Sequence, residues 1–260
     1  MFPGLNFFPE GQIIAFALVF LRAMAFVMSW PVFGVNQIPV QVKILLALVL
    51  SVSLFPTLKF VNTEQLMEGE QILFLAVREL LIGLFLGYLM RFFFFAVSIA
   101  GELIGLSTGL SSAQMFNPLS GVSSNVMEQF QVILASLILL TLNGHHLFLQ
   151  SWAQSYQLVP ISDFGFSAGA LTQVPVLVSE VFLLGIRMAA PVIVSVFLAN
   201  MALGVLGRAV PQLNIFALSL QVTIFLGLIV VFIGMPLFVE DMNGLLTLMG
   251  QRVKSVLEVL

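Results

Sequence analysis

Six long apolar stretches constrain this chain more than any other feature of its sequence. They cover about residues 12–33, 42–61, 71–100, 130–150, 174–206 and 213–240. A helix needs about 20 mostly apolar residues to cross the hydrocarbon core of a bilayer, so each stretch is long enough to span it. The strands of a membrane β-barrel would alternate apolar and polar residues with a period of two, and these stretches do not. We therefore predict an all-α, multi-helix membrane protein.

Composition excludes the soluble alternatives. Apolar residues make up 60% of the 260 residues and charged residues only 8%, against about 45–50% and about 25% in soluble domains. Nine Lys and Arg with a net charge of −3 leave no basic surface for nucleic acid. The chain has no Cys, which removes disulfides and thiolate metal sites. A soluble enzyme, a nucleic-acid binder and a disordered chain are therefore excluded.

Prolines predict kinked or interrupted helices, because each removes an N–H donor and biases the preceding residue away from the helix. The stretches 71–100 and 174–206 are long enough for either one tilted helix or a broken pair. Polar connections are expected at 59–70, 101–129 and 151–173. The prolines concerned are Pro31, Pro56, Pro175, Pro191 and Pro236.

Charged residues inside or beside the apolar stretches are predicted to face protein or water. An Arg at the bilayer centre costs about 2.5–3.5 kcal/mol even on a lenient scale. The loops 101–129 and 151–173 contain no Lys or Arg, so the positive-inside rule gives almost no orientation. Such charges serve as structural ion pairs, helix-end charges or proton relays. The candidate buried charges are Arg22, Arg78, Glu180, Arg187 and Arg208, of which Glu180 and Arg187 lie two turns apart on one face.

Small residues recur at helical spacing. Gly101, Gly105 and Gly109 lie at i, i+4 and i+8, and Gly83 and Gly87 repeat the spacing. Small residues four apart allow helix backbones to approach closely, which is how helices associate in lipid. We predict that both sets pack helices within a close-packed assembly.

No catalytic or metal-binding pattern is present in the sequence. His145 and His146 are adjacent, so on a helix they point about 100° apart and chelate one metal poorly. There is no Walker loop, no HExxH motif and no Ser/His/Asp order. We predict a protein without catalysis, metal or cofactor; an intramembrane enzyme using the two histidines is the weakest alternative.

Motifs in order along the chain carry a resemblance to a known family. They are Arg22, Trp30-Pro31-Val32-Phe33-Gly34, Ile38-Pro39, Val42-Lys43, Asn143-Gly144-His145-His146, Ser155-Tyr156, Pro191, Asn200, Gly204, Arg208 and Pro211-Gln212-Leu213-Asn214-Ile215-Phe216. Together they resemble the FliR/SctT family of type III secretion export-gate proteins. One departure is Asn117-Pro118, where the family has Asp before the Pro.

The resemblance implies a single-copy subunit of the FliP–FliQ–FliR export gate. Its fold would be a FliP-like helical part, residues 1–173, followed by a FliQ-like hairpin and tail, residues 174–260. The gate passes unfolded flagellar proteins across the bacterial inner membrane at the flagellar basal body. Its implied partners are FliP, FliQ, FlhB, FlhA and membrane lipid, with energy from the proton motive force and a partner ATPase.

The family's pore plug corresponds to about residues 107–122, including Met115, Phe116, Asn117 and Pro118. Flexible Met and bulky Phe suit a reversible seal that repacks around a passing chain. Two other functions stay open. The virulence counterpart of the gate shares the same motifs, and a secondary transporter of a small solute also has broken helices and buried charges.

Overall fold

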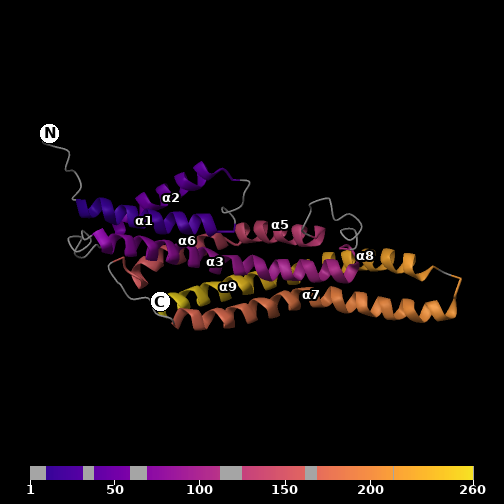
Figure 1. The fold of residues 1–260 in the computed structure, drawn as a ribbon. Helices are drawn as coiled ribbons and strands as arrows, with labels where there is room; N and C mark the ends of the chain where they lie inside the picture. The colour runs from indigo at the N-terminus through magenta and orange to yellow at the C-terminus, as the bar shows by residue number, and fades with distance from the viewer. Residues whose placement is uncertain are drawn as a thin grey trace. The chain divides into compact units, whose positions relative to one another are not determined.

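A computed structural model describes residues 10–31, 38–58, 69–111, 125–161, 169–212 and 214–259. Within these ranges the chain is almost entirely helical and contains no strand, which confirms the all-α prediction. The helices are α1 (Glu10–Ser29), α2 (Val40–Leu54), α3 (Gly69–Thr108), α5 (Val126–Thr141), α6 (Gly144–Leu158), α7 (Gly169–Ala209), α8 (Ile215–Ile233) and α9 (Met235–Val259), with a 3-10 helix η1 (Phe55–Thr57) after α2 (Figure 1).

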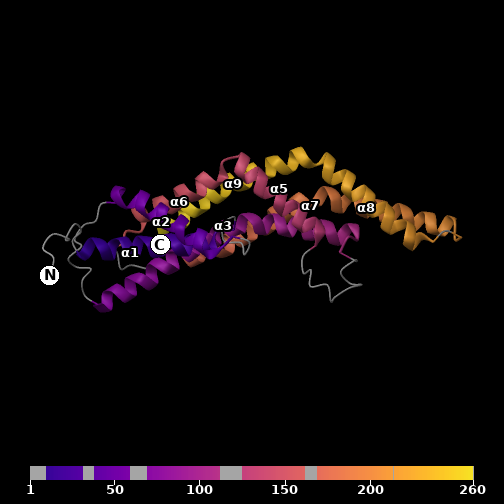
Figure 2. The same ribbon diagram turned by 90° about the horizontal axis from the view of Figure 1, so that it is seen from above.

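The six predicted stretches correspond to four helices long enough to cross a membrane and to two bent helix pairs. Four helices qualify alone, over Gly11–Ser29, Val40–Thr57, Ile72–Thr108 and Thr172–Ala209. Two further pairs qualify together: α5 with α6, bent by 72°, and α8 with α9, bent by 60°. Figure 2 shows the change of direction between α8 and α9. The described part of the chain thus offers up to six spans if each bent pair is one span.

Some helices end where proline predicts, and others do not. α1 ends at Ser29 just before Pro31, α2 ends at Leu54 just before Pro56, and the 60° bend between α8 and α9 lies next to Pro236. However, α7 continues through Pro175 and Pro191 without interruption. The backbone hydrogen bonds lost at a proline are tolerated in membrane helices when other groups pair with the freed carbonyls. The stretch 130–150 breaks at Asn143, whose φ of 56° lies in the left-handed region that Asn tolerates better than most residues. The expected loop 151–173 is also wrong in part, because α6 extends to Leu158.

Two compact units divide the chain. The first comprises residues 1–91, 145–175 and 249–260, and the second comprises residues 92–144 and 176–248. α3 contributes to both units, and so does α9. The units interleave along the sequence, whereas the predicted division at residue 174 rests on likeness to two other proteins and stays a prediction.

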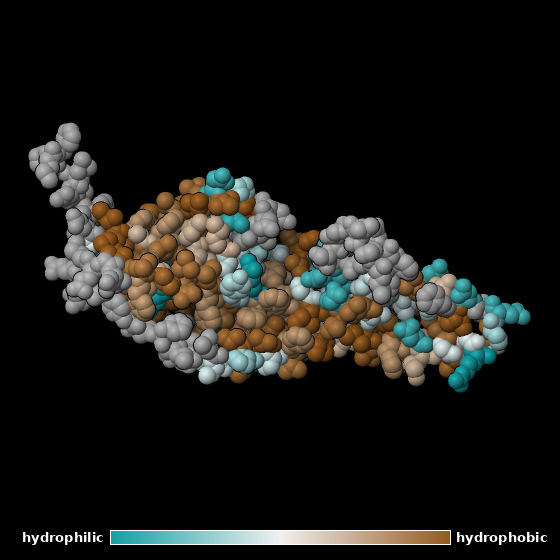
Figure 3. Space-filling view, in the orientation of Figure 1, coloured by the Kyte–Doolittle hydropathy of each residue, from teal (hydrophilic) through white to brown (hydrophobic). Residues whose placement is uncertain are grey.

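In the first unit, α2 packs on α1 with its least apolar side. Its buried residues are Lys43, Ala47 and Ser51, spaced four apart, while Leu45 and Val49 on other faces are exposed. Figure 3 shows apolar residues over much of the visible face of this unit. A helix that buries its polar residues and exposes its apolar ones requires lipid or another protein around it.

Candidate functional site: buried anchors between the helices

Arg22 on α1 is the centre of the polar core of the first unit. Its Nε donates to Glu79 Oε2 at 2.5 Å and its Nη2 to Glu79 Oε1 at 2.9 Å, and both side chains are fully buried. Nη1 donates to Ser155 Oγ at 3.2 Å and Nη2 also to the Val159 carbonyl at 3.1 Å. A bidentate pair with further hydrogen bonds is the arrangement in which buried charges are tolerated. Arg22 therefore connects α1, α3, α6 and the residue that follows α6.

Aromatic rings enclose this ion pair. The Arg22 guanidinium lies 4.2 Å from the centre of the Tyr156 ring, and Tyr156 Oη donates to the Val19 carbonyl at 3.0 Å. Trp152 stacks on Phe26 with 6.2 Å between ring centres. A low-dielectric surrounding strengthens the attraction within the ion pair and makes an unpaired charge there costly. The cluster fixes α6 against α1.

Arg78, also on α3, binds the same end of α6. It is 4% exposed, and its Nη1 donates to the Pro160 carbonyl at 3.1 Å. Arg91 is partly exposed, and its Nε donates to the Ser29 carbonyl at the end of α1, at 2.8 Å. Cations near the carbonyl end of a helix are favourable because that end carries partial negative charge. Both arginines join helix ends within the first unit.

The Gly83–Gly87 pair packs α3 directly on α1. A Cβ at Gly83 would overlap the Arg22 carbonyl, and one at Gly87 would overlap the Ser29 side chain. Both glycines are buried. The prediction that small residues four apart bring backbones together therefore describes a contact inside this chain, which leaves this face unavailable to a partner subunit.

In the second unit, α3 packs on the start of α5 through Gly101 and Gly105. A Cβ at Gly101 would lie 2.5 Å from Glu128 Cα, and one at Gly105 would overlap the Asn125 side chain. Asn125 caps α5, since its Oδ1 accepts from the Met127 N–H at 3.0 Å. Gly109 does not belong to this stripe, because α3 ends at Thr108 and Gly109 has a φ of 85°, which favours glycine.

A hydrogen bond joins the end of α3 to the start of α5. Asn125 Nδ2 donates to Ser111 Oγ at 2.8 Å. Thr223 Oγ1 on α8 donates to the Thr108 carbonyl at 3.0 Å, and this replaces the helical donor that the last turn of α3 lacks. Residues 111 and 125 are therefore held together. The predicted plug residues Met115, Phe116, Asn117 and Pro118 lie outside the described residues.

The remaining candidate charges are less buried than expected. Arg187 and Arg208 on α7 are exposed in this chain, and Glu180 is intermediate, so the prediction that the two arginines are buried does not hold within the chain itself. Arg187 pairs with Asp241 on α9, with 3.6 Å between Nη2 and Oδ1. The sequence spacing places Glu180 on the same face of α7 as Arg187, two turns away, and does not identify a partner on another helix. Asp241, Glu79 and Asn125 were not singled out as sites, because each depends on a helix distant in sequence.

The chain is similar to known proteins over most of its length. The family described as "Bacterial export proteins, family 1" matches residues 13–249. The chain belongs to this family. FliR-type relatives cover nearly all of it. The flagellar biosynthetic protein FliR of Bacillus subtilis (strain 168) is 34% identical over 91% of this chain and 96% of its own length. The proteins of the same name from Escherichia coli (strain K12) and Aquifex aeolicus (strain VF5) are 33% and 31% identical, over 84% and 90% of this chain and 82% and 90% of their own lengths.

The family membership confirms the resemblance drawn from the motifs. Members of this family are named as export and flagellar biosynthetic proteins, and none of the three relatives is named as an enzyme. Within the described residues, no group of three or more His, Cys, Asp or Glu is placed to hold a metal ion. The anchors are therefore interpreted as structural elements of a membrane export protein.

Proposed function

We propose that this chain is a subunit of the flagellar type III export gate in the bacterial inner membrane. It would form part of the pore through which unfolded flagellar proteins pass, together with FliP and FliQ and next to FlhB and FlhA. Family membership supports a role in flagellar export. The length of two apolar helices supports the more specific proposal that this chain packs against other subunits in a pore.

The apolar spans in α3 and α7 are longer than a bilayer needs. They run over 37 and 38 residues, which corresponds to about 55 Å each at about 1.5 Å per residue. The hydrocarbon core is about 30 Å thick. Fitting such a span into it requires a tilt of about 55–60°, whereas transmembrane helices tilt by about 0–40°. Protein rather than lipid is therefore expected to cover part of each helix.

The exposed side chains of α7 and α8 fit that explanation. On α8, Phe225 and Phe232 are 68% and 79% exposed, and on α7 Leu183 and Val205 are 67% and 70% exposed. Apolar faces of this extent mark contacts with lipid or protein. We assign residues 174–260 as the FliQ-like part and residues 1–173 as the FliP-like part, each placing its exposed faces against the corresponding subunits.

Residues 107–122 are proposed to seal the pore, with Met115, Phe116, Asn117 and Pro118 in the seal. The described flanks support this position, since Ser111 and Asn125 are joined and Asn125 sits on Gly105. The segment therefore leaves and re-enters the helices at one anchored point. No energy source is assigned to this chain, and the proton motive force and a partner ATPase would drive export.

Coexpression with the neighbouring membrane genes of its operon tests the assembly. The mass of the detergent-extracted complex should be several times 28.4 kDa, with one copy of this chain. A lone monomer or a simple homodimer would contradict the gate and favour the small-solute transporter.

A deletion of residues 110–118 tests the seal. The complex should still assemble, and cells should leak ions across the inner membrane. The matched control is a deletion of residues 60–68, which is equally long and lies in the connection between α2 and α3. Tight membranes with the first deletion, or equal leakage with both, would refute the seal.

A further inference from the structure

α6 presents a polar outer side in the first unit. Across its described residues Gly144–Leu158, the single large apolar side chain that is exposed is Leu158, at the last position. The polar side chains recur every three or four positions and therefore share one side of the helix. Those that are exposed or partly exposed are His146, Gln150, Gln154 and Gln157.

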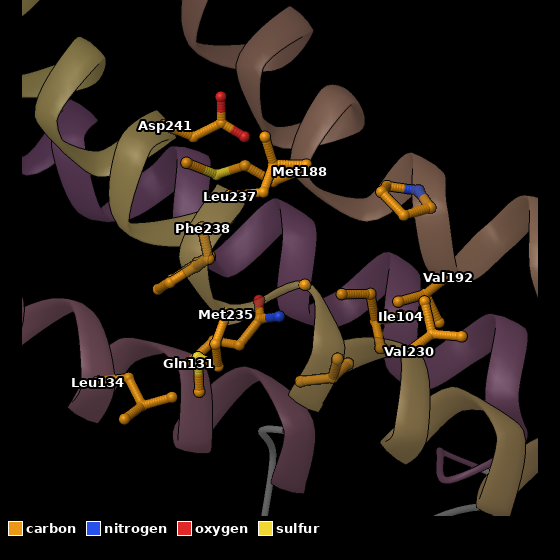
Figure 4. A pocket seen from close by; sticks show the side chains of 13 residues that line it. Ile104, Gln131, Leu134, Met188, Val192, Val230, Met235, Leu237, Phe238 and Asp241 are labelled. Carbon is orange, nitrogen blue, oxygen red and sulfur yellow. The ribbon is translucent and has the colours of Figure 1, made fainter.

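The end of α9 has the same distribution in the same unit. Its buried residues are apolar, namely Met249, Val253, Val256 and Leu257. Its exposed residues are Gln251, Lys254 and Ser255. The start of α9 differs, because Leu237 and Val239 are exposed there and Phe238 lines a mostly apolar cavity of the second unit (Figure 4). The outer side of α9 thus changes from apolar to polar toward the end of the helix.

α6 and α9 lie side by side and run in the same direction (Figure 2). Leu147 covers Gly250, since a Cβ at Gly250 would lie 3.0 Å from Leu147 Cδ1. Leu246 covers Gly144 in the same way, because a Cβ at Gly144 would lie 2.8 Å from Leu246 Cδ2. Each of these contacts lies within one unit. Because the residue numbers of the two contacts rise together on both helices, the helices are parallel.

The polar sides of the two helices form one face. Successive helical residues are rotated by about 100°, so Gln150 lies about 60° to one side of Leu147. Gln251 lies about 100° to the other side of Gly250. In parallel helices, opposite rotations from the line of contact point to the same face of the pair. This face, the amide surface, comprises His146, Gln150, Gln154, Gln157, Gln251, Lys254 and Ser255.

The amide surface does not fit lipid or a stable subunit contact. An amide exposed to hydrocarbon has no hydrogen-bond partner there, and each unpaired polar group costs several kcal/mol. Stable protein interfaces have an apolar core, and α2 and α3 of the same unit offer one, with Leu45 62% and Leu73 70% exposed. By comparison, the described residues of α6 and of the end of α9 expose only Leu158 among large apolar side chains. Water is therefore expected to cover the amide surface.

We propose that the amide surface borders the aqueous path of the exported chain and forms transient hydrogen bonds with its extended backbone. A Gln side chain carries a carbonyl acceptor and an NH₂ donor, the same kinds of group as a peptide unit, so it pairs with a chain of any sequence. Lys254 is the one charged residue of the surface, and an exposed charge holds an opposite charge only weakly. This role rests on the proposed export function.

Crosslinking to an arrested substrate tests the contact. The chain contains no Cys, so single replacements give site-specific thiols. The full chain, coexpressed with the other gate subunits, carries Gln150→Cys or Gln251→Cys. The matched controls are Leu45→Cys and Leu73→Cys, on the exposed apolar sides of α2 and α3. The substrate is an unfolded flagellar protein with one Cys, fused to a tightly folded domain that cannot pass, and a bifunctional maleimide joins the two thiols.

Gln150→Cys and Gln251→Cys should each give a product with the mass of this chain plus the substrate, whereas the two controls should give none. Met115→Cys, in the proposed seal, separates this inference from the export function. Crosslinks at Met115→Cys without any at positions 150 and 251 would overturn the amide surface as a contact and leave the export function standing. No crosslink at any of these three positions would overturn both. Equal crosslinking of the controls would also overturn the contact.

Thiol labelling gives a second readout of the same variants. A charged maleimide, which stays in water, should label Gln150→Cys and Gln251→Cys in empty complexes and should label them less once the substrate is arrested. Leu45→Cys should stay unlabelled in both states. Labelling that the arrested substrate leaves unchanged would show that the amide surface faces bulk water. No labelling in empty complexes would show that another subunit covers it, and either result would overturn the proposal.

Discussion

Replacing Arg22 by Met tests whether the buried ion pair holds the first unit together. The change removes four hydrogen bonds and leaves Glu79 as a fully buried carboxylate without its cation. Removing one partner of a buried pair costs about 3–5 kcal/mol. That corresponds to a roughly 100- to 5,000-fold shift of the folding equilibrium towards the unfolded state.

The assay is reversible unfolding in mixed detergent, followed by tryptophan fluorescence. Trp30 and Trp152 are the only two tryptophans of the chain, and they are 1% and 3% exposed in the unit that contains Arg22. The signal therefore reports on the affected unit. Arg91→Met is the matched control, since Arg91 is partly exposed and its described side-chain hydrogen bond is a single one, to Ser29. Its cost should be about 1 kcal/mol.

The double variant Arg22→Met with Glu79→Met separates pairing from packing. Apolar replacement of both partners is often close to neutral, so the double variant should recover most of the stability lost in Arg22→Met. A loss below about 1 kcal/mol in Arg22→Met, or a double variant no more stable than the single one, would refute the reasoning, because the charge left on Glu79 would then not be the cause.

Two further substitutions follow from the packing, and far-UV circular dichroism during thermal unfolding measures both. Gly105→Ala should lower the free energy of unfolding by about 1–3 kcal/mol, since the added Cβ overlaps the Asn125 side chain that caps α5. The control Gly204→Ala meets no atom within 4 Å and should raise stability by up to about 1 kcal/mol. Equal effects of the two changes would argue against the α3–α5 contact. Ala47→Phe should cost about 1–3 kcal/mol by overpacking the contact of α2 with α1. Leu48→Phe, 42% exposed, should stay within about 0.5 kcal/mol, and an Ala47→Phe variant of equal stability would refute the burial of that face.

The helical class and the spans could be predicted from the sequence because they depend on local composition. A run of apolar residues long enough to cross a bilayer has few stable structures there other than a helix. The break between α5 and α6 was missed for a local reason as well. Asn143 adopts a left-handed conformation without any proline nearby, so a prediction from proline does not place a break there.

The contacts of the site were less accessible to prediction. Arg22 can be singled out from the sequence as a charge within an apolar stretch, but its partner Glu79 is 57 residues away and next to another charge, Arg78. Helical spacing places Glu180 and Arg187 on one face of α7, but the ion pair of Arg187 forms with Asp241 on α9. Spacing identifies which residues share a face, but it does not tell which distant helix packs against that face.

The interleaving of the two units has a consequence for the order in which they are synthesised. Residues 249–260 belong to the same unit as α1, and Met249, Val253, Val256 and Leu257 on α9 are at most 2% exposed. The ribosome must therefore translate beyond residue 248 before the unit that contains the earliest helix has all its parts. Until then, the surfaces that α9 will cover in that unit remain open. Insertion of the early helices and completion of their core are therefore separate events, spaced by the translation of most of the chain.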